Sequence, residues 1–154
     1  MLVALYVGVF LASAPIWLRY YQQYFDAQKD WTLACVHEVS KAIDQYAEPG
    51  ETIISTWSGY PAISHARQFA GMENDSRLAS AELLSDHELL TYRLLNQRQS
   101  ESAIRRHQVR IVVFAHRRSP PGTVPEEGYA ALLPVSGYMK VRSVGATDVY
   151  VCAE

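Results

Sequence analysis

The sequence predicts an α/β domain: a small, mainly parallel sheet flanked by helices, with a C-terminal antiparallel hairpin, preceded by one N-terminal transmembrane helix. Three observations lead to this fold class: an uncharged opening segment, strand-like runs that alternate with helical patterns, and two adjacent strand-like runs near the end of the chain. Strands separated by helices indicate parallel pairing, whereas two strands joined by a short turn pair antiparallel. The chain of 154 residues is long enough for one such domain with its own core.

The opening segment, "MLVALYVGVFLASAPIWL" at positions 1–18, contains no charged residue and is followed by Arg19. A helix of this length spans roughly 27 Å, which is close to the hydrocarbon thickness of a bilayer. Aromatic residues gather at its end, as is typical of a membrane interface. These residues are Trp17, Tyr20, Tyr21 and Tyr24. We therefore assign residues 1–20 to a transmembrane helix and residues 21–154 to an α/β domain.

Two other interpretations of the opening segment remain. A secretory signal peptide would end near the "ASA" at 12–14, although Pro15 follows directly and no basic region precedes the apolar run. A core helix would be equally apolar, although this segment has no polar face at all. The charges of this chain do not orient a span across the membrane.

Periodicity predicts the next elements in order. An amphipathic helix covers about 31–46, because apolar residues recur at three- and four-residue steps, and Pro49 with Gly50 ends it. The run "ETIIST" (51–56) is a short buried strand, and a second short strand follows at about 67–69. Residues 78–97 are helical in two pieces, the second opened by the capping-box spacing in "SDHE".

The second half of the chain begins with a helix over about 101–107. It leads into "VRIVVFA" (109–115), whose continuous apolar run suits a central parallel strand covered on both faces. The phrase "TVPE" then opens a helix that runs to about residue 133. The runs "YMKVRSV" and "TDVYVCA" are two strands joined through Gly145 and Ala146, which predicts a hairpin.

Composition excludes several classes of function. The net charge of −2 offers no basic face for nucleic acid, so no nucleic-acid partner is expected. The sequence has no Gly-rich phosphate loop, nucleophile elbow, helical histidine pair or CxxC motif, so no catalytic or metal-ligating residue and no cofactor is predicted in this chain. The scattered histidines are interpreted as surface or capping residues. Cys35 and Cys152 are either two buried thiols or, if the domain lies outside the cytoplasm, a single bridge.

The loop after the first strand is the main candidate for a binding site. In open α/β sheets, ligands bind beyond the carboxyl ends of the parallel strands. "WSGYP" follows the strand at 51–56 and "HRRS" follows the strand at 109–115, so Trp57, Tyr60, His116 and Arg117 are expected to converge. The aromatic rings suit the C–H face of a sugar, and the arginine suits a phosphate. Alternatively, Trp57 folds back into the core and the other residues form a turn and a solvated face.

A second group of candidates surrounds the short strand at 67–69. Arg67 begins this strand, and Glu73, Asn74 and Asp75 follow the turn at Gly71, which would place them on the same rim. Two other interpretations stay open. Asp75 or the serine after it caps the next helix, or Glu73 and Asp75 share a divalent ion.

The order of these motifs resembles a known family. A last transmembrane helix, an amphipathic helix ending in "PG", a strand followed by "TWSGYP", then "ARQF" and "GMEND", look like the extracytoplasmic C-terminal region of membrane glycosyltransferases of the C fold. These enzymes use polyprenyl-phosphate sugars and include the protein-mannosyltransferase-like family. A looser similarity exists to oligosaccharyltransferases, whose "WWDYG" stretch is matched here only by Trp57 and Tyr60, since Ser58 and Gly59 stand in place of its second tryptophan and its aspartate.

The resemblance implies a role and a location. It implies an extracytoplasmic domain at the cell membrane whose partners are the bilayer, the remaining transmembrane part of the transferase, and a lipid-linked sugar or acceptor. The family's catalytic carboxylate lies in a first extracytoplasmic loop that this chain lacks, so the chain is expected to be a fragment without activity of its own. A divalent metal would belong to the full-length enzyme. Two alternatives remain: a membrane-anchored interaction module with Trp57 buried, and a small ligand-binding or hydrolytic domain.

Overall fold

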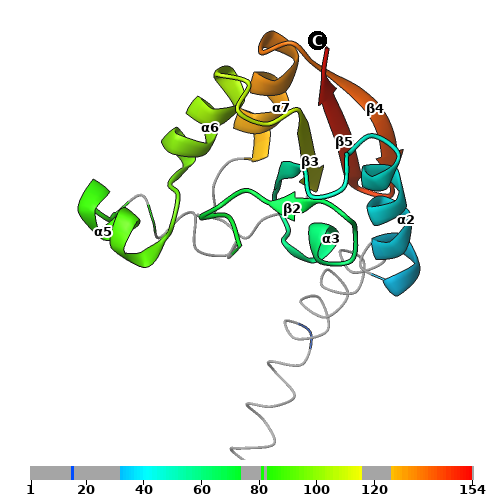
Figure 1. The fold of residues 1–154 in the computed structure, drawn as a ribbon, viewed down its shortest axis with the longest axis horizontal. Helices are drawn as coiled ribbons and strands as arrows, with labels where there is room; N and C mark the ends of the chain where they lie inside the picture. The colour runs from blue at the N-terminus through cyan, green and yellow to red at the C-terminus, as the bar shows by residue number, and fades with distance from the viewer. Residues whose placement is uncertain (1–14, 16–31, 74–80, 82, 116–125, 154) are drawn as a thin grey trace, which may run out of the picture.

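The computed structural model describes residues 32–73, 83–115 and 126–153, together with residues 15 and 81. The described residues form an α/β fold with a five-stranded sheet in the order β2-β1-β3-β5-β4 (Figure 1). The strands are β1 (Thr52–Ser55), β2 (Arg67–Gln68), β3 (Ile111–Ala115), β4 (Tyr138–Val144) and β5 (Thr147–Cys152). The helices are α2 (Leu33–Asp44), α3 (Gly59–Ala62), α5 (Asp86–Tyr92), α6 (Gln97–Arg105) and α7 (Glu126–Val135).

The sheet is mixed rather than mainly parallel. Strand β1 pairs in parallel with β2 and with β3, as the alternation of strands and helices predicts. The C-terminal hairpin makes up a large part of the sheet, because β5 pairs antiparallel with the central strand β3 over five residue pairs. Strand β4 then pairs antiparallel with β5 and forms the edge. The α/β class, the flanking helices and the C-terminal hairpin are thus confirmed, and the "mainly parallel" description is corrected to an even mixture.

Helices cover both faces of the sheet, with α2 on one side and α6 and α7 on the other (Figure 1). Alternate strand residues point to opposite faces, so the core is divided into two clusters. Ile53, Ile111 and Val113 pack against α2, whereas Ile54, Val112 and Phe114 pack against α6 and α7. Strand β3 is buried along its whole length, which confirms its prediction as a central strand.

Local sequence signals set the helix ends. Thr32 caps α2 by accepting a hydrogen bond from the Cys35 N–H, and Ser85 and Glu88 form the expected capping box at the start of α5. Helix α6 begins earlier than predicted, because Asn96 and Gln99 form a second capping box in which the cap is asparagine rather than serine or threonine. The short helix α3 also lies where a loop was expected.

The hairpin between β4 and β5 turns through Gly145 and Ala146, as predicted. The φ of Gly145 is +56°, which suits the first loop position of a tight hairpin turn and favours glycine there. Cys35 and Cys152 are not joined by a disulfide.

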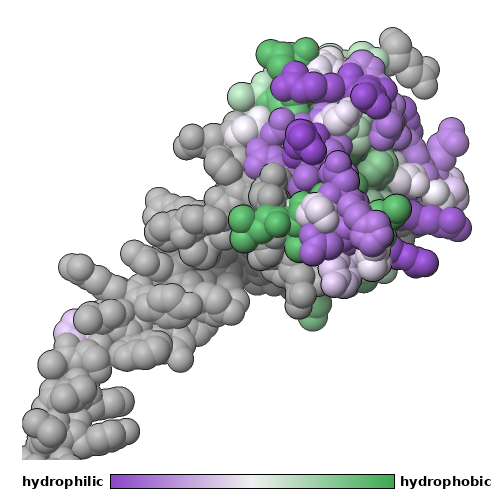
Figure 2. Space-filling view, turned by 90° about the vertical axis from the view of Figure 1, so that its left-hand side faces the viewer, coloured by the Kyte–Doolittle hydropathy of each residue, from purple (hydrophilic) through white to green (hydrophobic). Residues whose placement is uncertain are grey.

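The predicted transmembrane helix lies outside the described residues apart from position 15, so it stays a prediction. In the part of the chain that the structure describes, no helix is both long and apolar enough to cross a membrane. Figure 2 shows a mainly hydrophilic face on which hydrophobic side chains form separate spots rather than one continuous band. Isolated hydrophobic residues of this kind are ordinary on a protein surface.

Candidate functional site

The candidate site is built on the carboxyl ends of β1 and β3, which lie side by side. The Thr56 N–H donates to the Val113 carbonyl at 3.0 Å, and the Thr56 Oγ1 accepts from the Ala115 N–H at 2.9 Å. Ser55 is fully buried, and its Oγ both donates to the Trp57 carbonyl at 2.7 Å and accepts from the Trp57 N–H at 3.3 Å. These bonds fix the backbone from which the Trp57 side chain projects.

Trp57 and Tyr60 are brought together, as the sequence predicted, but their environments differ. Their rings meet edge to face, with centroids 4.7 Å apart and planes at 82°. Trp57 is half-buried and packs against the α2-side core, while Tyr60 is only 1% exposed. The Tyr60 hydroxyl shares a hydrogen bond of 2.8 Å with Thr147 Oγ1 on β5. Tyr60 therefore packs against the indole from inside the domain, and of the two aromatic residues only Trp57 is partly exposed.

Gly59 sets the position of the indole. A Cβ atom at Gly59 would lie 2.3–2.6 Å from three carbons of the Trp57 six-membered ring, which is closer than real Cβ atoms approach. The Trp57 ring thus lies directly over the backbone of Gly59, and glycine at this position is a packing requirement of the loop.

Gln68 at the end of β2 is a polar residue of the site that the sequence reasoning missed. Its Nε2 donates to the Ser55 carbonyl at 2.7 Å and to the Met72 carbonyl at 2.9 Å, and these two acceptors fix the orientation of the amide. Its Oε1 is a buried oxygen with no hydrogen-bond partner among the described residues. A buried acceptor in this state costs about 1–3 kcal/mol, and a donor group reaches it only if the atoms that cover it move aside. The glutamine in the strand-like stretch "ARQF" could have indicated this polar position.

The remaining predicted residues do not all meet Trp57. Arg67 opens β2, its side chain is exposed, and its guanidinium lies beside Gly50, at the amino end of β1 rather than at its carboxyl end. Glu73 is exposed, and its carboxylate accepts from the Gly71 N–H at 2.7 Å, on the turn that Gln68 holds through Met72. The other four candidates, Asn74, Asp75, His116 and Arg117, lie outside the described residues.

A buried carboxylate on β5 was also missed. Asp148 pairs with Phe114 across the sheet, near the carboxyl end of β3, and its side chain is 8% exposed. It accepts hydrogen bonds from Ser143 Oγ at 2.5 Å, Lys140 Nζ at 3.3 Å and Tyr150 Oη at 3.4 Å. Burial, the charge of Asp148 and this hydrogen bond together raise the pKa of Tyr150. The aspartate inside the apolar run "TDVYV" was the signal in the sequence.

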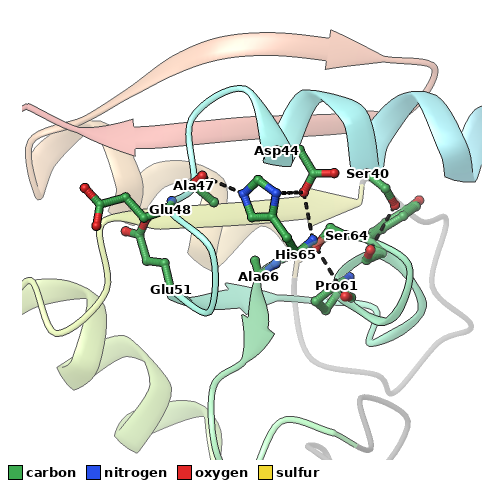
Figure 3. A network of polar contacts seen from close by, with 10 residues as sticks. Ser40, Asp44, Ala47, Glu48, Glu51, Pro61, Ser64, His65 and Ala66 are labelled. Atoms are coloured by element: carbon green, nitrogen blue, oxygen red, sulfur yellow. Dashed lines mark hydrogen bonds and ion pairs between the residues drawn. The ribbon is translucent and has the colours of Figure 1, made fainter.

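His65 joins α2 to the loop before β2 (Figure 3). Its backbone N–H donates to Asp44 Oδ1 at 2.9 Å, its Nδ1 lies 3.3 Å from the same oxygen, and its Nε2 lies 2.6 Å from the Ala47 carbonyl oxygen. Since a carbonyl can only accept, the Nε2 carries a proton and donates. The network ties together two segments of the fold, and His65 is exposed, as expected for a surface histidine.

Among the described residues, no group of three or more His, Cys, Asp or Glu side chains could hold a metal ion. Comparison with known protein families, with curated proteins and with solved structures found no match. The described geometry provides one partly exposed indole, one buried amide oxygen in need of a donor, and rigid strand ends that carry both.

Proposed function

We propose that this chain is the extracytoplasmic C-terminal domain of a membrane glycosyltransferase that moves a sugar from a polyprenyl-phosphate donor to an acceptor. In this role the chain binds and does not catalyse, and the loop after β1 faces the acceptor or the sugar. The observation that carries the proposal is the half-buried Trp57 at the carboxyl ends of two parallel strands, which is where open α/β sheets bind ligands. The resemblance of "TWSGYP", "ARQF" and "GMEND" to this enzyme family supplies the class of substrate.

The chemistry of the rim supports a sugar-like ligand. The exposed part of the Trp57 indole offers an apolar surface to the C–H face of a pyranose ring. When the atoms that cover Gln68 Oε1 move aside on binding, a ring hydroxyl donates to it, which removes the cost of leaving that acceptor unpaired. Glu73, on the adjacent turn, adds a carboxylate, and the proposal extends to Asn74, Asp75, His116 and Arg117, which stand in the two segments that border these strands.

A second candidate function is a membrane-anchored interaction module without ligand chemistry. It is favoured by a specific observation: Tyr60 is 1% exposed and hydrogen-bonded to Thr147, and the Trp57 ring lies over Gly59, so the loop packs largely on itself. Under this alternative, Trp57 completes the core and the loop recognises no small ligand.

Titration of the full chain in lipid nanodiscs separates the two. The chain contains three tryptophans, so 5-fluorotryptophan labelling gives a small set of ¹⁹F resonances in which Trp57→Phe assigns the site signal. Polyprenyl-phosphate-sugar headgroups and short acceptor peptides are added in separate titrations. We expect a saturable shift of the Trp57 resonance that Gln68→Leu weakens about tenfold, since a neutral hydrogen bond to a buried acceptor contributes about 1–1.5 kcal/mol.

Gln108→Leu is the matched control, because Gln108 is an exposed glutamine just before β3, at the opposite end of the sheet. It should leave the titration unchanged. A Trp57 resonance that does not move at millimolar concentrations of either ligand contradicts the glycosyltransferase proposal and leaves the interaction module.

A further inference from the structure

A second cluster of reactive side chains lies at the other end of the sheet from Trp57. Cys152 ends β5 beside the amino end of β3, where its N–H donates to the Arg110 carbonyl at 2.8 Å. It carries a free thiol and is 9% exposed. Its Sγ lies 3.6 Å from His107 Nδ1, and its thiol donates a hydrogen bond to the Ala153 carbonyl at 3.4 Å. The imidazole and the thiol come from positions 45 residues apart, so only the fold brings them together.

His107 occupies a backbone position that normally takes glycine. Its φ is +52°, and the bonds His107 N–H to Ile104 O and Gln108 N–H to Ala103 O, both 3.0 Å, form the motif that ends many helices in a left-handed residue. A glycine would satisfy this helix end with less strain. The backbone conformation alone therefore does not explain why this residue is a histidine. The contacts of the imidazole with Tyr138 on β4 and Cys152 on β5 do explain it.

The hydrogen bonds of His107 show which ring nitrogen carries the hydrogen when the imidazole is neutral. The Nε2 lies 2.9 Å from the Ser136 carbonyl oxygen, and since a carbonyl only accepts, the Nε2 carries the hydrogen. In a neutral imidazole, Nδ1 then holds the lone pair, and that lone pair faces the Cys152 Sγ. The Tyr138 ring meets the imidazole edge to face at 5.8 Å and holds it from the side.

Tyr138 does not compete for this proton. Burial, with a further contribution from the neighbouring Cys152, raises the pKa of Tyr138 to about 12. Its hydroxyl donates to the Val109 carbonyl at 2.5 Å. Tyr138 therefore stays neutral and hydrogen-bonded at every pH at which a thiol and an imidazole exchange a proton.

We propose that Cys152 is a reactive thiol that exchanges with small disulfides and that His107 is its general base. The S–H turns from the Ala153 carbonyl to His107 Nδ1, which accepts the thiol proton, and the Cys152 thiolate attacks one sulfur of the disulfide. A new S–S bond forms between Cys152 and that sulfur while the original S–S bond breaks, and the second sulfur leaves as a thiolate that takes the proton back from the imidazolium. The low exposure of Cys152 favours small linear disulfides such as oxidised glutathione over protein disulfides. This site is independent of the rim around Trp57.

The test uses the full chain with Cys35→Ala, so that Cys152 is the one thiol present. The rate of mixed-disulfide formation with oxidised glutathione is followed by intact mass. We expect His107→Asn to lower this rate about tenfold at neutral pH, since asparagine tolerates the left-handed backbone but does not act as a base. His87→Asn is the control, because His87 is an exposed histidine on α5 and should leave the rate unchanged.

The pH profile separates a base from a merely structural residue. The advantage of the wild-type chain over His107→Asn should shrink as the pH rises into the alkaline range, because hydroxide then deprotonates a thiol without help from an imidazole. The same chain unfolded in urea serves as a reference that needs no histidine variant. A folded-state rate no faster than the unfolded-state rate, or equal rates with and without His107 in folded proteins, overturns the proposal.

Discussion

The ion pair between Glu51 and Arg110 gives the sharpest quantitative prediction. The Arg110 Nε donates to Glu51 Oε1 at 3.1 Å and its Nη2 donates to Glu51 Oε2 at 2.8 Å, while Nη2 also donates to the Tyr46 carbonyl at 2.6 Å. The side chains are only 18% and 33% exposed. The pair links the residue before β1, the residue before β3 and the loop after α2, so it stabilises the amino ends of two neighbouring strands.

Glu51→Gln removes the negative charge and leaves the guanidinium beside a neutral amide. Breaking a fully buried pair costs about 3–5 kcal/mol, whereas an exposed pair contributes about 0–1 kcal/mol. The two-point geometry and the low exposure place this pair between those limits. We expect a loss of about 2 kcal/mol in the free energy of unfolding at neutral pH, measured by urea denaturation of the full chain followed by circular dichroism.

The same pair predicts a dependence on pH. Burial raises the pKa of Glu51, but the hydrogen bonds from Arg110 and from the Glu48 N–H, with the nearby charges of Arg110 and His65, outweigh it and hold the pKa below its ordinary 4.5. A carboxyl whose pKa is lower in the folded state stabilises the fold above its unfolded pKa and loses that contribution as the pH falls through the folded pKa. The difference between the wild-type chain and Glu51→Gln should therefore shrink below about pH 4.

Glu38→Gln is the matched control, because Glu38 pairs with Lys41 at 2.9 Å but both side chains are more than half exposed. The urea midpoint should not change in this variant, since solvent screens such pairs. The reasoning is refuted if Glu51→Gln destabilises the chain no more than Glu38→Gln does, or if its effect persists undiminished at acid pH.

Three further predictions concern the packing around the two clusters. Gly59→Ala should displace the Trp57 indole, costing about 1–3 kcal/mol in urea denaturation and shifting the tryptophan emission, because the new Cβ would overlap the ring; an unchanged emission would contradict the described packing. Tyr60→Phe should cost about 1–2 kcal/mol in the same assay, because it takes the hydroxyl partner from buried Thr147, and no loss would mean that this bond does not form. In an ultraviolet titration, Tyr138 should ionise only near pH 12, and since its pKa is raised in the folded state, its stabilising contribution should be lost as the pH rises above about 10. Ionisation of Tyr138 together with exposed Tyr92 would refute this.

The sequence determined the local elements of this protein. The capping box at Ser85 and Glu88, the buried run of β3 and the turn at Gly145 were all predicted and are confirmed. Each depends on residues within a few positions of one another, because capping, periodicity and tight turns are set by neighbours along the chain. The α6 start was missed for a local reason as well, since Asn96 replaces the usual serine or threonine of the box.

The tertiary structure alone decided the order of the strands and the contacts between distant residues. The sequence predicted a hairpin but not that β5 would lie against β3, which makes the sheet mixed. It placed Trp57 and Tyr60 in one loop but did not predict that Tyr60 would be buried against Thr147. The contact between His107 and Cys152 was not predicted from the sequence either. Such pairs form only when the whole core closes over them, because burial and long-range hydrogen bonds depend on the packing of all the elements at once and leave no periodic pattern in the chain.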